Sequence, residues 1–278
     1  TGELKTTTLG TSNFRAGVNA GNSIASGGNY NTVVGDEAGT DITTGDNNVA
    51  VGFDAGKAST TAAQNVLIGS GAGDSGTTFY NNVAIGYLAL SADTLGSNNV
   101  AIGKAALAVQ NFTSSTDANN VAIGSNAGAA VTTATQNTFI GGLSGDAFTD
   151  GAANTALGFE TLTADTKGNN AVALGHHALS TQNFTTTTAS YNVAVGSQAG
   201  LAVTTGINNT LVGGLAGDSL TDADYNTAVG FGALTTDVLG SRSVAVGFEA
   251  LKTQSRDSAA NMLNVGVGFN AGTAITTG

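Results

Sequence analysis

The feature that most constrains this chain is a short motif that recurs along nearly its whole length. The motif reads Asn, Val or Thr, usually Ala, a branched aliphatic residue, Gly, two variable residues, Ala, and then Gly or Leu; residues 82–90 and 192–200 are clear copies. Fourteen copies are recognisable, and a degenerate fifteenth surrounds Gly17. The central glycines of the fourteen copies are Gly35, Gly52, Gly69, Gly86, Gly103, Gly124, Gly141, Gly158, Gly175, Gly196, Gly213, Gly230, Gly247 and Gly268. Such repetition indicates stacked, equivalent units rather than an ordinary globule.

The spacing of these glycines has two levels. Most neighbours are separated by a 17-residue interval, but a longer, 21-residue interval follows Gly103, Gly175 and Gly247, so a 72-residue unit is superimposed on the shorter repeat. Other residues keep the longer register: Asp74, Asp146 and Asp218; Asp93, Asp165 and Asp237; Gln110, Gln182 and Gln254. We expect the four extra residues to form regularly spaced bulges at one edge. These bulges are predicted around residues 110–119, 182–190 and 254–261.

Each copy holds a short segment whose side chains alternate between two faces. In residues 82–86, Val83 and Ile85 point to one face and Ala84 to the other. Because a single copy of the motif is too short to bury a core alone, the copies must stack as coils, and the Asn before each strand is expected to stack into a ladder. The sequence therefore predicts an all-β fold, a parallel β-solenoid (β-roll) of about 14 to 15 coils. A lead-in over residues 1–30 would hold the degenerate repeat, and the continuous array would occupy residues 31–278.

The two faces of the strand predict how the coil is covered. We expect the Val and Ile side chains to form the ladder between coils, which leaves a face of Ala and Gly without a cover of its own. The simplest cover is the same face of another copy, and closed symmetric assemblies provide it. The sequence thus predicts that the chain is its own partner, and a parallel homotrimer would bury the faces around one axis.

The amino-acid composition argues against several classes of function. The formal net charge of -11 opposes binding to nucleic acid or to an anionic membrane, because there is no basic stripe to displace counterions. No apolar run reaches the length of a transmembrane helix, so we expect no membrane insertion in this segment. The chain has no Cys, which removes disulfides and thiolate metal sites, and we expect no cofactor. The absence of Pro is typical of a chain whose amides are needed for sheet ladders.

Two copies of the motif carry a family resemblance. Residues 120–127, Asn-Val-Ala-Ile-Gly-Ser-Asn-Ala, resemble the head repeats of trimeric autotransporter adhesins of the YadA type. Residues 226–234, Asn-Thr-Ala-Val-Gly-Phe-Gly-Ala-Leu, resemble more closely the repeats of phage tail fibres. The resemblance covers about residues 13–278 and implies a left-handed parallel β-roll, a parallel trimer and a role in attachment. The adhesin repeat is usually shorter than the repeat found here, which favours a virion fibre over a bacterial adhesin.

Two sets of residues are candidates for metal binding. His176 and His177 are the only histidines, and they occupy the variable positions after Gly175. A ring of His around a three-fold axis could hold a metal, but adjacent strand residues face opposite ways, so we favour two unrelated outward side chains. The acidic set on turns could bind calcium, but the dense glycine–aspartate signature of calcium-binding rolls is absent. We favour solvated turn caps for this set, which comprises Asp74, Asp146 and Asp218, and we assign no metal site.

Aromatic residues in the bulges are the candidates for binding a partner. Phe112 and Phe184 each follow Gln-Asn, whereas the third bulge has Ser255 and Arg256 instead. An exposed ring there could contact a glycan or a protein. The alternative is that each ring plugs its bulge against the coil.

The chain shows no arrangement typical of a catalytic centre. With two histidines and a monotonous repeat, no catalytic residue is assigned, and we do not expect an enzyme. The leading hypothesis is a structural, adhesive trimeric fibre segment, part of a phage tail fibre that attaches the virion to a host cell-surface glycan or protein. The nearest alternative is the head or stalk of a bacterial trimeric autotransporter adhesin. The alternative from another class is a glycan-cleaving tailspike, since paired carboxylates can come from distant coils. Each hypothesis places the segment outside the cell, on a virion or on a bacterial surface.

Overall fold

The structure is a computed structural model that describes residues 9–256 and 258–277, and all the regular elements among them are β-strands. The chain divides into two compact units, residues 1–136 and residues 137–278, and each is considered by itself. In both units, short parallel strands recur with the period of the short repeat, one in each coil. The predicted parallel β-solenoid is thereby confirmed, with about 15 turns in total.

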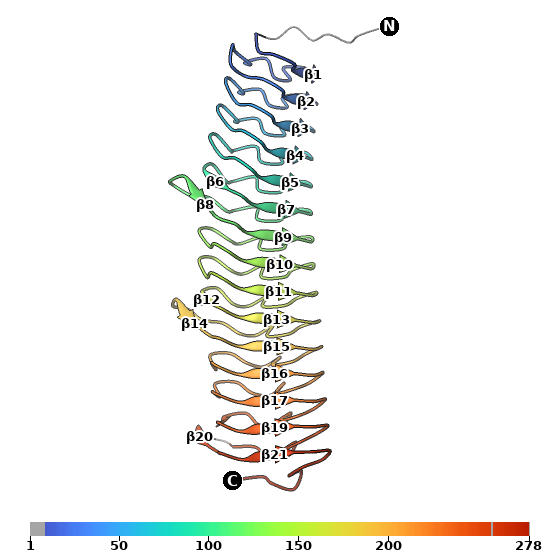
Figure 1. Cartoon of the computed structure of the whole chain (residues 1–278), viewed down its shortest axis with the longest axis vertical. Coiled ribbons are helices and arrows are strands. Elements are labelled where there is room, and N and C mark those ends of the chain that lie inside the picture. The colour runs from blue at the N-terminus through green and yellow to red at the C-terminus, as the bar shows by residue number, and fades with distance from the viewer. Residues whose placement is uncertain (1–8, 257, 278) are drawn as a thin grey trace. The chain divides into compact units, whose positions relative to one another are not determined.

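The described part of the first unit contains seven coils, drawn from blue to green in Figure 1. Their strands are β1 (Phe14–Ala16), β2 (Thr32–Val34), β3 (Val49–Val51), β4 (Val66–Ile68), β5 (Val83–Ile85), β7 (Val100–Ile102) and β9 (Val121–Ile123). Equivalent positions of successive copies pair, so that Ala84 in β5 lies opposite Ala101 in β7. The degenerate repeat forms a full coil, because β1 pairs with β2. The division into a lead-in and an array stays a prediction.

The second unit contains eight coils in its described residues. Their strands are β10 (Thr138–Ile140), β11 (Thr155–Leu157), β13 (Val172–Leu174), β15 (Val193–Val195), β16 (Thr210–Val212), β17 (Thr227–Val229), β19 (Val244–Val246) and β21 (Val265–Val267).

The predicted bulges form where the four extra residues occur. In the first unit, β8 (Thr116–Asp117) leaves the coil and pairs with β6 (Gly96–Ser97). In the second unit, β14 (Thr188–Ala189) pairs with β12 (Gly168–Asn169), and β20 (Ala260–Asn261) pairs with β18 (Gly240–Ser241). Figure 1 shows these short strands at the edge of the stack of coils in each unit.

The central glycine of each coil has a backbone conformation that other residues avoid. Gly103 has a φ of 131°, and a Cβ atom built on it would lie 2.4 Å from the carbonyl oxygen of Gly124 in the next coil. The fourteen central glycines share this conformation, with φ between 127° and 141°. At Gly103 glycine is therefore required for two reasons, the backbone conformation of the turn and the close approach of the neighbouring backbone.

The interior of the coil contradicts one expectation from the sequence. Ala84, at the centre of β5, is fully buried, whereas Val83 and Ile85 are only partly buried. Ala89, from the turn that follows, is also fully buried. The small-residue face therefore lines the core, and the prediction that it needs another copy as its cover is wrong. The face left uncovered is the one that carries the large aliphatic side chains.

A shortage of space inside the coil explains this arrangement. Where the strand centre is Ala84, the residue six positions later is the buried Leu90. Where the strand centre is Leu67, that later position is Gly73, and a Cβ atom built there would lie 2.7 Å from Leu67 Cδ2. Large strand-centre residues of this kind recur once in each 72-residue unit, at Leu67, Phe139 and Leu211. The 72-residue repeat thus preserves the positions of the large and small interior side chains as well as the positions of the bulges.

A pair of substitutions two residues apart tests the role of the turn. We expect Gly103→Ala to destabilise the protein by about 2 kcal/mol or more, because it adds backbone strain and a clash. Ala105 has a φ of 54°, a left-handed backbone conformation that is unfavourable for a residue with a side chain. We therefore expect Ala105→Gly to stabilise the protein by about 1 kcal/mol. Guanidinium titration followed by far-UV circular dichroism would compare the unfolding midpoints of both variants with that of the unchanged protein. Equal midpoints for the two variants would contradict the proposed backbone constraint.

Candidate functional site

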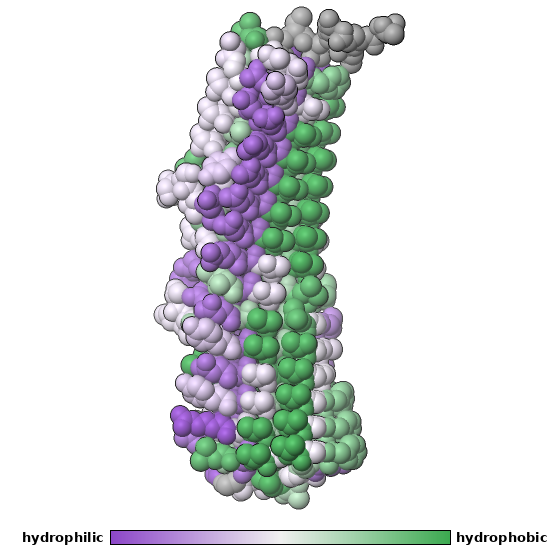
Figure 2. Space-filling view, viewed as in Figure 1, coloured by the Kyte–Doolittle hydropathy of each residue, from purple (hydrophilic) through white to green (hydrophobic). Residues whose placement is uncertain are grey.

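The outward side of the strands carries an uncharged column of aliphatic side chains. Apart from β1, each three-residue strand of the coils in both units has Val, Ile or Leu as its third residue and Val or Thr as its first. We call the third residues the aliphatic face: Val34, Val51, Ile68, Ile85, Ile102 and Ile123 in the first unit, and Ile140, Leu157, Leu174, Val195, Val212, Val229, Val246 and Val267 in the second. Figure 2 shows apolar side chains gathered in columns beside a polar surface. Exposed apolar area of this extent is typical of an interaction surface.

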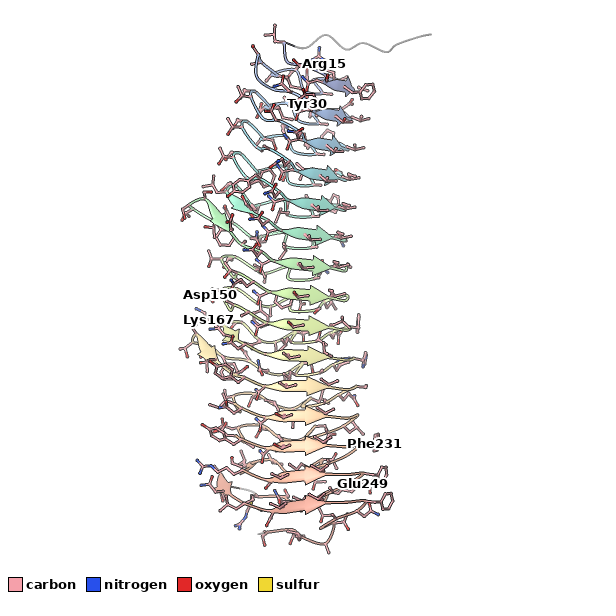
Figure 3. All side chains as sticks on the ribbon, in the orientation of Figure 1. Arg15, Tyr30, Asp150, Lys167, Phe231 and Glu249 are labelled. Atoms are coloured by element: carbon pink, nitrogen blue, oxygen red, sulfur yellow. The ribbon has the colours of Figure 1, made fainter. Side chains whose placement is uncertain are left out.

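Stacked phenylalanines border the aliphatic face at three coils of the second unit. Phe231, Phe248 and Phe269 each follow a central glycine, and their ring centroids are 5.8 and 5.1 Å apart. The ring planes of neighbouring residues are within 14° of parallel, and all three side chains are exposed, Phe269 by 75%. Figure 3 shows Phe231 at the rim of its coil, near Glu249. The ladder therefore adds an exposed aromatic surface beside the aliphatic face.

The two histidines lie together, which the sequence did not predict. Their ring centroids are 4.0 Å apart, because His176 and His177 lie in a turn, where side chains do not alternate as they do in a strand. Phe159 stacks on His176, and Nε2 of His177 lies 3.2 Å from Oε2 of Glu160. The prediction that the histidines face opposite ways is wrong. Within residues 9–256 and 258–277, no group of three or more His, Cys, Asp or Glu side chains is placed to hold a metal.

The acidic set on the turns is less solvated than expected. Asp74, Asp146 and Asp218 are partly buried, and burial raises the pKa of each carboxyl above its usual value. Oδ1 of Asp218 accepts a hydrogen bond of 2.5 Å from the Thr235 hydroxyl. The corresponding oxygens of Asp74 and Asp146 are buried without a hydrogen-bond partner. The prediction of solvated turn caps is wrong for these buried oxygens.

The aromatic residues proposed for partner binding lie inside the structure. Phe112 is 6% exposed and Phe184 is 5% exposed. The interpretation of these rings as surface contacts for a glycan is therefore wrong. They plug the bulges against the coil, which was the alternative interpretation.

Asparagine side chains connect one coil to the next, as predicted. Oδ1 of Asn31 accepts hydrogen bonds from the backbone nitrogen of Asn48 at 3.0 Å and from its Nδ2 at 3.1 Å. Nδ2 of Asn48 also donates to the carbonyl oxygen of Ala62, at 2.7 Å. The pattern recurs at most coils, but Ala171 and Ser243 replace Asn where two coils of the second unit lead into their bulges. The ladder satisfies buried polar groups that would otherwise be costly.

A buried relay of Asp, Gln and Asn anchors each bulge. In the first unit, Gln110 Nε2 donates to Asp93 Oδ2 at 2.5 Å, and Gln110 Oε1 accepts from Asn120 Nδ2 at 2.9 Å. The other carboxylate oxygen of Asp93 accepts from the backbone nitrogen of Gly96 at 2.9 Å. The same Asp–Gln–Asn relay recurs twice in the second unit, as Asp165, Gln182 and Asn192, and as Asp237, Gln254 and Asn264.

The relay is the feature that reasoning from the sequence missed. Its signal was the longer register of Asp and Gln, but spacing alone does not show that both side chains point inward and meet. Burial raises the pKa of Asp93 and of Asp165, while the surrounding hydrogen-bond donors act in the opposite direction. The carboxylates lie within the fold rather than in an open cleft, so the relay is structural.

Removal of the central amide tests the relay. Gln110→Ala would remove two buried hydrogen bonds, the one that Gln110 donates to Asp93 Oδ2 and the one that it accepts from the Asn120 amide. We therefore expect the free energy of unfolding to fall by roughly 2–3 kcal/mol. Thr113→Ala, at the exposed tip of the same bulge, should change stability by less than about 0.5 kcal/mol. Differential scanning calorimetry would compare the two variants. Equal melting temperatures would show that the relay does not stabilise the bulge.

The raised carboxyl pKa values predict a pH dependence of stability. For a carboxyl whose pKa is higher in the folded state, the folded protein binds more protons between the usual pKa of 3.8 and the raised one. Stability therefore falls as the pH rises through that window, and the full penalty remains at pH 7. We expect a higher melting temperature near pH 4 than near pH 7. Asp146→Asn should raise the melting temperature at pH 7 and flatten the profile, and an unchanged profile would contradict this explanation.

Comparisons with known proteins do not assign this chain to a family. No protein-family model, no curated protein and no solved structure matches this chain. Among the described residues, there is also no helix with the length and apolarity needed to span a membrane. The resemblance to adhesin heads and tail fibres therefore rests on the repeat motif alone.

Proposed function

We propose that this chain is a structural segment of an attachment fibre, in which copies associate through the aliphatic face. The observation that carries the proposal is the uninterrupted, uncharged aliphatic column on the outside of each unit, with Ile68 37% exposed and Leu157 48% exposed. A soluble surface rarely keeps such a column uncovered. Burial of this column against other copies would remove it from water.

Charge and periodicity both favour a second copy as the partner. Each copy has a formal net charge of -11, so copies repel one another except where an uncharged face lets them approach. The side chains of the column are spaced by one coil, or about 4.8 Å. A parallel copy has the same spacing by construction, so its side chains can interdigitate at every coil. The stacked Phe231, Phe248 and Phe269 would extend this contact in the second unit.

The number of copies and the biological setting come from the resemblance. Adhesin heads and tail fibres with such repeats are parallel trimers, so a homotrimer is the assembly we propose. We propose a phage tail fibre as the first setting, because the repeat is longer than in adhesin heads, and a bacterial trimeric adhesin as the second. In either setting the segment would space or present a tip that binds a host glycan or protein.

Cysteine cross-linking tests the association, since the chain has no Cys of its own. In a parallel, in-register assembly, equivalent residues of the aliphatic face meet, so Val195→Cys should form disulfide-linked pairs of chains on mild oxidation. In a trimer, the third chain would stay unlinked. Thr187→Cys, on an exposed bulge tip, is the matched control and should stay reduced.

Absolute mass in solution completes the test. Light scattering on a size-exclusion column should give a species near three times the 27.1 kDa mass of one chain. A well-folded species of one chain mass would contradict self-association. A multimer in which Thr187→Cys cross-links and Val195→Cys does not would place the contact on another face.

A further inference from the structure

Two of the bulges begin with the same acceptor sequence for N-linked sugars. Asn111, Phe112 and Thr113 form one Asn-x-Thr tripeptide, and the second starts at Asn183, the equivalent position of the next 72-residue unit. Asn-x-Ser/Thr, where x is not Pro, is the sequence that N-glycosylation requires. The chain has one further such tripeptide, at Asn208 in the second unit.

The buried phenylalanine orients both acceptor tripeptides. Phe112 and Phe184 are buried, while the Asn before each ring is exposed, as is the Thr after it. Oδ1 of Asn111 accepts a hydrogen bond from the Thr94 hydroxyl at 2.8 Å, and Oδ1 of Asn183 accepts one from Thr166 at 3.3 Å. The amide oxygen is thus held toward the neighbouring coil. The amide nitrogen, which is the atom that bears a sugar, lies on the other side of the amide group.

The third acceptor tripeptide is part of a coil, with Asn208 partly exposed and Thr210 exposed. Asn208 has a φ of 58°, and its backbone nitrogen donates to Ser190 at 2.7 Å. The middle residue, Asn209, is fully buried in the asparagine ladder, and Thr210 begins β16. The backbone and the middle residue of this tripeptide are thus held within the coil. In contrast, the tripeptides that start at Asn111 and Asn183 lie outside all strands.

We propose that Asn111 and Asn183 are N-glycosylation sites. The sugar donor is a phosphate-activated sugar, on a nucleotide or a lipid carrier. A bond forms between the amide nitrogen and C1 of the sugar, the bond from C1 to the phosphate oxygen breaks, and the phosphate leaves with the electron pair. The amide nitrogen gives up one proton to a base of the transferase.

The position of the second site is compatible with association through the aliphatic face, although the proposal does not depend on that association. Figure 3 places Lys167, in the turn before β12, and Phe231 at opposite edges of the second unit. The bulge that starts at Asn183 pairs with β12, so a sugar there would project away from the phenylalanine ladder.

Peptide mass spectrometry of the full chain, recovered from its natural source, tests the proposal. We expect sugar mass additions on Asn111 and Asn183 and none on Asn208. Unmodified peptides at both bulges would overturn the proposal, as would equal occupancy at Asn208.

Variants expressed in the same source separate enzymatic recognition from chemical glycation. Thr113→Ser keeps the hydroxyl and should keep the sugar on Asn111. Thr113→Ala should abolish it there while Asn183 stays occupied as an internal control. A sugar on Asn111 that survives Thr113→Ala would also overturn the proposal.

Discussion

The close approach of neighbouring backbones at the central glycines is the constraint on which the rest of the structure depends. A Cβ atom at Gly103 would lie 2.4 Å from the next coil's carbonyl oxygen, so only glycine permits the spacing that parallel strands need. Once that spacing is set, equivalent residues of successive coils lie side by side. Identical side chains can then form ladders, of which the asparagine ladder is the most extensive.

The narrow coil that results decides which side chains lie inside. A fully buried Ala84 leaves room for Leu90, whereas a large strand-centre residue such as Leu67 is followed six residues later by Gly73, where a side chain would clash with it. In the Ala-centred coils the larger aliphatic residues of the strand lie on the outer side. The aliphatic face is present in Ala-centred and Leu-centred coils alike, and it is the surface that we propose joins copies of the chain.

Much of the fold follows from periodicity in the sequence, because each coil repeats the same local solution. The strands, the glycine turns, the asparagine ladder and the positions of the bulges could all be predicted in this way. The side of the strand that faces inward could not, since both Val83 and Ala84 are apolar and period 2 does not distinguish inside from outside.

The candidate site was harder to predict, because its residues depart from the repeat. Phe112 could lie inside or outside a bulge of unknown path, and the structure buries it. The rings of His176 and His177 lie together because these residues are in a turn, where side chains do not alternate between two faces as they do in a strand. Asp93 and Gln110 share a register that was visible, but only the coil geometry brings their side chains within 2.5 Å.

Amide hydrogen exchange, resolved by peptide, tests the ladder of coils most directly. If each coil pairs with the next as described, the strand amides of β3 and of β16 should exchange equally slowly, although they lie in different units. Residues 113–115, at the tip of the first bulge, should exchange at close to the unprotected rate. Strand amides that exchange as fast as the bulge tip would contradict the stacked solenoid and, with it, the aliphatic face.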